Sequence, residues 1–181
     1  MSHVLGVCPH DVTQDPEKWT AFATELRARG VIDSSFAPEP CFEKYAQGFS
    51  SYTLAYAHPL HAVVLWRRFG FTPIAAYKDT FDEAVVIAGK QIKSPSLAAI
   101  GHARVACIHG SPSHAAFLID LCARSIPSPA LCAAKSSYPD VVMAVAQGEA
   151  TYGVVLNSVW ETMMTLRDRV RPFHTTKTRK L

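Results

Sequence analysis

The chain contains 181 residues, of which 49% are hydrophobic and 18% are charged, and its formal net charge is +3. A chain of this length buries about 70% of its unfolded surface, which suffices for one packed domain or two small lobes, and the composition excludes disorder and a collagen-like fibre. Charged residues interrupt the longest apolar runs well before the roughly 20 apolar residues that a bilayer span requires, so we expect no membrane-embedded segment.

Short apolar runs and amphipathic stretches alternate along the sequence. The pattern predicts strands over residues 3–7, 32–36, 52–57, 84–88, 104–108, 130–134 and 152–156, with a further extended run over 72–77. Capping residues and apolar stripes predict helices over 16–29, 42–46, 59–69, 113–124, 138–147 and 158–169. This alternation is typical of an α/β fold with a mostly parallel sheet and helices on both of its faces.

The regular alternation of strands and helices is interrupted between residues 80 and 93, and this interruption divides the predicted elements into two lobes. We expect residues 1–80 to form the first lobe, 81–93 a hinge or crossover, and 94–169 the second lobe. Residues 170–181 are a segment that can return to the first lobe, which is otherwise minimal or completed by a partner chain.

The distribution of basic residues and cysteines bears on nucleic-acid binding and on disulfide formation. Six of the 18 basic residues lie in the tail, Arg167 to Lys180, where a solvated chain end explains them better than a nucleic-acid surface does. The odd number of cysteines and the absence of a CxxC pair indicate free, mostly buried thiols, with one or two disulfides in an exported protein as the alternative. We expect no cofactor.

The first residues carry no basic segment followed by an apolar stretch, so the sequence predicts no export signal.

The sharpest local feature is the turn after the strand predicted at 104–108. Gly110, Ser111, Pro112 and Ser113 lead into a helix, so backbone N–H groups and two hydroxyls converge and can cradle an oxyanion. An ordinary serine N-cap explains the same residues equally well. The turn is neither a P-loop nor a nucleophile elbow, because the Gly-Lys-Ser/Thr ending and the second glycine of G-x-S-x-G are absent.

Histidines also gather after predicted strands, where open α/β sheets bind ligands. Six of the eight occupy such positions: His10, His58, His61, His109, His114 and His174. This pattern leaves open a second class of function, a protein that binds a transition metal or a metal chelate. Its candidate ligands are Cys8, His10, His58, His61 and His109. A small hydrolase with His114 as base for Ser111 or Ser113 is a third alternative.

The order of motifs from Tyr52 to Trp160 resembles the phosphonate-binding family of periplasmic solute receptors, which have a two-lobed type II fold and serve ABC transporters. The resemblance rests on Tyr52 to Pro59, Phe71 to Ala75, Val85 to Leu97, Arg104 to Ser113 and Val141 to Ala150. The first fifty residues match more loosely, through Gly6 to Pro9 and Trp19. The family's ligand-facing histidine near Tyr138 is absent, and Thr151 stands where an aspartate is typical, which argues against an aminoalkylphosphonate ligand.

The resemblance implies a binding protein without catalysis that holds phosphate, phosphite or a phosphonate-like anion in an interlobe cleft, for transport or sensing. Its partners would be the ligand and an ABC transporter permease or a sensor, with no nucleic acid and with a homo-oligomer left open. It implies a periplasmic location, against a cytoplasmic one suggested by the missing export signal. Expected ligand-binding residues are Ser111, Ser113, His114, His58, Tyr138, Tyr77, His61 and Thr151.

Overall fold

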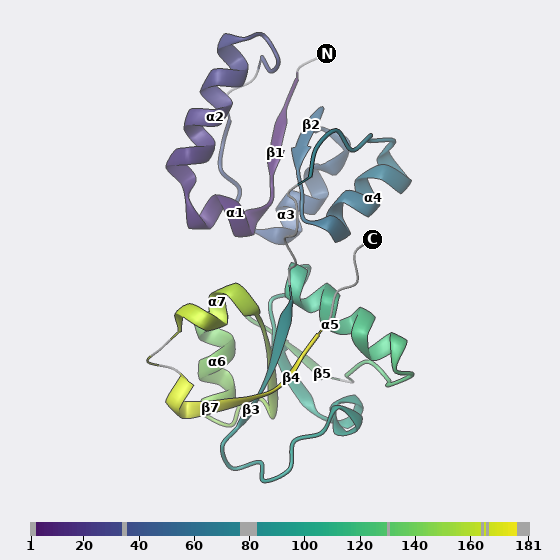
Figure 1. The fold of residues 1–181 in the computed structure, drawn as a ribbon, viewed down its shortest axis with the longest axis vertical. Coiled ribbons are helices and arrows are strands. Elements are labelled where there is room, and N and C mark those ends of the chain that lie inside the picture. The colour runs from purple at the N-terminus through teal and green to yellow at the C-terminus, as the bar shows by residue number, and fades with distance from the viewer. Residues whose placement is uncertain are drawn as a thin grey trace. The chain divides into compact units, whose positions relative to one another are not determined.

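The computed structural model describes residues 3–33, 36–76, 83–129, 131–163, 165 and 167–176. The chain forms two compact units, Met1–Tyr77 and Lys78–Leu181, and each is described by itself (Figure 1). Within the described residues, no helix is sufficiently long and apolar to cross a membrane.

The first unit is built on two short parallel strands. β1 (Leu5–Val7) pairs with β2 (Leu54–Tyr56), with Gly6 opposite Ala55. Four helices accompany them, together with a 3-10 turn at Gly48–Ser50: α1 (Pro9–Gln14), α2 (Pro16–Ala28), α3 (Phe42–Gln47) and α4 (Pro59–Phe69). The buried side chains fall into two clusters, one around Trp19 and Val12 and one around Tyr45 and Phe49.

Local sequence explains where the helices of the first unit begin and end. The carboxylate of Asp15 accepts the backbone N–H of Lys18, and Pro16 supplies a preset φ at the first position of α2. Pro59 does the same for α4, which ends at Gly70 in the left-handed conformation with φ 74°. Both helices therefore match their predicted bounds closely.

Two predicted extended segments of this unit do not form strands. Residues 32, 33 and 36 lie outside any strand, and Ile32 alone buries its side chain, which a bend in the chain achieves without a ladder. Residues 72–76 are also unpaired, and Ile74 is 82% exposed, so this run has no buried face to hold it in a sheet. The helix α1 was not predicted from the sequence.

The second unit contains a five-stranded sheet in the order β5-β4-β6-β3-β7. Its strands are β3 (Ala84–Gly89), β4 (Arg104–Cys107), β5 (Leu131–Ala134), β6 (Tyr152–Leu156) and β7 (Val170–Thr175). β4 runs parallel to β5 and β6, whereas β3 runs antiparallel to β6 and β7, so the sheet is mixed rather than mostly parallel.

Helices cover both faces of this sheet: α5 (Pro112–Ala123) one face, and α6 (Tyr138–Ala146) and α7 (Asn157–Thr162) the other (Figure 1). 3-10 turns occupy Leu97–His102 and Arg167–Arg169. Along β3, Val85 and Ile87 belong to the α6 cluster, whereas Val86 and Ala88 belong to the α5 cluster. Because successive strand residues point to opposite faces, this central strand reads as a continuous apolar run.

The structure revises the predicted division of the chain. β3, which the sequence assigned to the hinge, is a central strand of the second unit, because its six residues are all buried between two helical layers. The sequence allowed residues 170–181 to return to the first lobe. Residues 170–175 instead pair with β3 as the edge strand β7. Their Pro172 fits an edge position, where a missing N–H is tolerated. The helix predicted over 158–169 ends at Thr162.

Candidate functional site

The serine turn lies where β4 ends and α5 begins. Ser111 is the N-cap of α5: its hydroxyl oxygen accepts the backbone N–H of His114 at 3.2 Å, and its carbonyl accepts the N–H of Ala115 at 3.1 Å. Pro112 has no N–H to satisfy. Among the described residues, the N–H of Ser113 makes no backbone hydrogen bond, as expected for a first-turn amide, and it is buried with its residue.

A chain of hydroxyls extends from this turn to the next helix. The Oγ atoms of Ser111 and Ser113 are 3.1 Å apart, and the Oγ of Ser113 is 3.2 Å from the hydroxyl of Tyr138. β4 and β5 are parallel neighbours, so the helices that follow them start at the same edge of the sheet and bring Ser113 and Tyr138 together. Ser111 and Ser113 are 0% and 1% exposed, so the hydroxyls bond to one another rather than to water.

The starts of the two helices differ in charge. The first turn of α6 contains Asp140, whose carboxylate accepts the hydroxyls of Ser137 at 2.6 Å and Ser136 at 2.9 Å. These hydrogen bonds lower the pKa of Asp140. The first turn of α5 contains no acidic residue. A ligand anion therefore meets a negative charge at α6 and none at the start of α5.

Two other predicted ligand residues are not placed with this turn. Thr151 precedes β6, and its N–H donates to the carbonyl of Arg104, the first residue of β4. It thus lies at the amino end of β4, about 10 Å from the edge where Ser111 follows the strand, given a rise of about 3.3 Å per residue. Tyr77 lies outside the described residues.

His58 and His61 belong to the first unit, at the start of α4. His58 is buried, and its Nδ1 accepts the N–H of Leu60 at 3.2 Å, so this imidazole serves as the N-cap. His61 packs among aromatic rings, with centroids 5.5 Å from Tyr45 and 5.6 Å from Phe49. Both positions have a structural explanation inside the first unit.

The predicted metal ligands are not gathered into one group. Cys8 is fully buried in the Tyr45 cluster, and His10 lies on α1 with a ring nitrogen 3.1 Å from the amide of Gln14. His109 lies in the second unit. Within the described parts of the chain, a different trio has three potential ligand atoms within 4.8 Å of one another: Cys107, His114 and Cys132.

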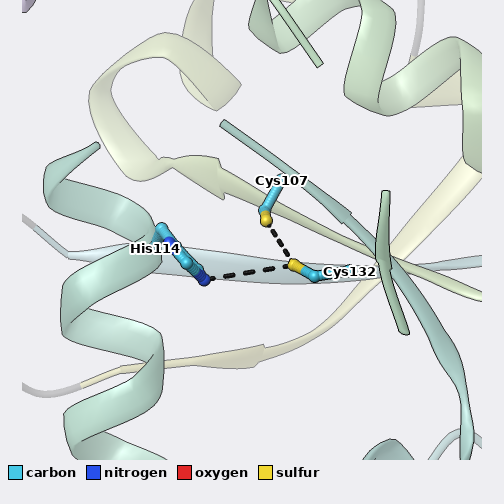
Figure 2. Close-up of side chains that lie close together, drawn as sticks. All are labelled: Cys107, His114 and Cys132. Atoms are coloured by element: carbon cyan, nitrogen blue, oxygen red, sulfur yellow. Dashed lines mark hydrogen bonds between the residues drawn. The ribbon is translucent and has the colours of Figure 1, made fainter. Parts of the chain in front are cut away.

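Figure 2 shows this trio, in which two strands and one helix contribute a side chain each. The sulfurs of Cys107 and Cys132 are 2.6 Å apart, and the Nε2 of His114 is 4.0 Å from the sulfur of Cys132. His109 stacks on His114, with ring centroids 5.2 Å apart and planes 9° from parallel. The imidazole of His114 is therefore directed at a thiol rather than at Ser111 or Ser113, which weakens the hydrolase alternative.

The two thiols differ in acidity. The hydrogen bond from Cys107 lowers the pKa of Cys132, and hydrogen bonds with His114 and His109 lower it further against the opposing effect of burial. The same bond and burial raise the pKa of Cys107. Of the two side chains, Cys132 is therefore the one that loses its proton more readily.

The sequence contained a signal for this trio, since both cysteines lie in consecutive predicted strands and both histidines lie between them. Close spacing along the chain does not reveal the trio, because its cysteines are 25 residues apart.

Solved structures share this architecture. The chain is similar to PhnD1 from Prochlorococcus marinus in complex with methylphosphonate, with a TM-score of 0.69 and 17% identity over 96% of this chain and 72% of that one. It is similar to a Xanthomonas citri protein bound to a chloride ion, with a TM-score of 0.70 and 13% identity over 97% and 73% of the two chains. A third, a binding protein component of an ABC phosphonate transporter from Pseudomonas aeruginosa, has a TM-score of 0.58 and 14% identity over 97% and 66%.

These likenesses confirm the predicted fold class, that of the type II periplasmic binding proteins. The family model described as "ABC transporter, phosphonate, periplasmic substrate-binding protein" matches residues 5–179, and the chain belongs to this family. The comparison with curated proteins gives no significant match.

Proposed function

We propose that the protein binds a small tetrahedral oxyanion of the phosphonate, phosphite or phosphate type at the start of α5, and delivers it to the permease of an ABC transporter. The observation that carries this proposal is the Ser111–Ser113 turn, with two hydroxyls, a first-turn amide and no acid. Membership of the phosphonate-binding family supports the class of ligand.

The hydroxyl chain suggests how the turn accepts its ligand. The oxygens of Ser111 and Ser113 lie within hydrogen-bonding distance of each other. An anion that enters takes the place of this bond, so that both hydroxyls and the amide of Ser113 donate to its oxygens. Tyr138 then orients the hydroxyl of Ser113 from the far side. Each hydrogen bond to a charged group contributes about 1.5–3 kcal/mol, so three of them support micromolar binding after the entropic cost.

Ligand-induced stabilisation tests this function. Methylphosphonate, phosphite, phosphate and sulfate are each added during thermal unfolding, and a true ligand at 100 times its Kd adds about 2.7 kcal/mol, or roughly 5–10 °C in Tm for a chain of this size. Methylphosphonate is the first probe because the similar Prochlorococcus protein was solved with it.

Variants of the turn locate the site. Ser113→Ala removes one donor, and we expect it to weaken binding by roughly tenfold to a hundredfold. Ser158→Ala, at an exposed position of α7, is the matched control and retains the full shift. Circular dichroism verifies that both variants fold. A Ser113→Ala protein that is folded and still shows the full shift shows that the anion binds elsewhere.

A further inference from the structure

The trio of Cys107, Cys132 and His114 follows from the register of the second sheet. In the parallel pair of β4 and β5, Cys132 lies opposite Val105, and Cys107 is two residues beyond Val105 on the same face. That face packs against α5, whose third residue is His114. Two strands and a helix thus direct three side chains to one point, near the outer edge of the sheet, because β5 is an edge strand.

The donor set is suited to a borderline or soft transition metal ion. Thiolate sulfur and imidazole nitrogen are the ligands of tetrahedral zinc, with Zn–S of about 2.3 Å and Zn–N of about 2.0–2.1 Å. Cys132 is half-buried, so an ion can reach its sulfur, whereas the sulfur of Cys107 closes the inner side. His109 is exposed and stacks on His114, so it is the nearest further imidazole that can complete the coordination.

We propose that Cys107, Cys132 and His114 bind one Zn²⁺ ion in the second unit, with His109 as the fourth ligand. Tetrahedral coordination places two sulfurs about 3.8 Å apart, given the Zn–S length of about 2.3 Å, so binding must part the sulfurs by about 1 Å. Rotation of the Cys132 side chain on the edge strand supplies this movement. His114 also belongs to the serine turn through its backbone N–H, but the metal would bind its imidazole, and neither proposal depends on the other.

A disulfide between the two cysteines is the competing account of their proximity. It explains the contact of the sulfurs but gives no role to the imidazole of His114, which approaches Cys132, or to His109, which stacks on His114. A metal ion uses all four side chains, and this convergence favours the metal.

Cobalt is the probe, because a tetrahedral Co²⁺ ion bound by thiolates gives intense visible bands and a thiolate-to-metal charge-transfer band. The protein is kept reduced and carries Cys41→Ser and Cys122→Ser, which remove the exposed thiols that bind metal adventitiously. We expect one Co²⁺ per chain, displaced by one equivalent of Zn²⁺, and a Tm that rises with either ion.

Variants then assign the ligands. Cys132→Ala and His114→Ala should each abolish the charge-transfer band or weaken binding more than about a hundredfold, and His109→Ala should weaken binding by about tenfold to a hundredfold. His102→Ala is the matched control, since it removes an exposed histidine of the same unit and should change nothing.

Two results overturn the proposal. One is a folded, reduced protein that gives no band at stoichiometric Co²⁺; loss of two thiols on mild oxidation would then assign the cysteines to a disulfide. The other is a band that survives both Cys132→Ala and His114→Ala, which places the metal elsewhere.

Discussion

The two units bury their apolar surfaces by different means. The first has two strands of three residues each, and its core combines aromatic rings, including Trp19, Tyr45 and Phe49, with aliphatic side chains. The second has a five-stranded sheet with a helical layer on each face, and its core is rich in valine. The carboxyl ends of β4 and β5 lie at one end of the second unit's sheet, where the hydroxyl chain begins, and the Cys107–Cys132 pair lies between the same two strands on the face that packs against α5.

Truncating one buried phenylalanine in each unit tests this contrast with the largest effect. Phe117, on α5, is 1% exposed beneath a rigid sheet, and we expect Phe117→Ala to lower the free energy of unfolding by about 3–5 kcal/mol. Phe49 packs beside Phe69, which is 41% exposed and able to move inward, so Phe49→Ala should cost less. Denaturant unfolding measures both losses of free energy, with amide hydrogen exchange in β6 reporting on the second unit and in β1 on the first. An equal or larger cost for Phe49→Ala contradicts the contrast.

A methyl group added to a glycine in each sheet gives a smaller effect. A Cβ at Gly153, in β6, would lie 2.9 Å from methyl groups of both Val141 and Val145 on α6. Such overpacking costs about 1–3 kcal/mol, because the helix cannot retreat from the sheet without losing other contacts. A Cβ at Gly6, in β1, would meet the ring of Tyr52, which is half-buried. This ring can turn away, so Gly6→Ala should destabilise less than Gly153→Ala, as measured by chemical denaturation. The opposite order would show that Tyr52 is held as firmly as α6.

Features set by local sequence could be predicted in both units. Pro59 and Gly70 bound α4 as expected, because a proline and a left-handed glycine act on their own neighbours. The turn at Ser111 was predicted for the same reason, since capping involves residues three apart. Its link to Tyr138 was expected only as a shared location, through the parallel order of strands.

Features set by pairing distant segments could not be predicted in this way. β7 has a proline and no apolar alternation, so only its partner β3 reveals it as a strand. The approach of Cys107 to Cys132 depends on the register of β4 and β5, which a single sequence does not specify. The prediction for residues 72–76 was wrong in the opposite sense. These residues favour extended structure, but among the described residues no strand pairs with them.

One ion pair in each unit gives the smallest expected differences in stability between the two units. In the second unit, Asp120 accepts the Nε2–H of His174 at 2.8 Å and the Nε–H of Arg124 at 3.0 Å, with its side chain only 13% exposed, and it ties α5 to β7. Asp120→Asn removes the charge that both donors face, and we expect a loss of about 1–2 kcal/mol. In the first unit, Glu25 pairs with Arg29 along α2, with side chains 58% and 72% exposed. Glu25→Gln should therefore cost at most about 0.5 kcal/mol, because water and salt screen the pair.

Urea unfolding at low and high salt separates the two pairs. Added salt should diminish the small effect of Glu25→Gln and leave most of the effect of Asp120→Asn, because the carboxylate of Asp120 is shielded from the solvent. Equal costs in both variants would mean that the α5–β7 contact is as solvated as a surface helix. The second unit would then not hold the charge of Asp120 more firmly than the first unit holds that of Glu25.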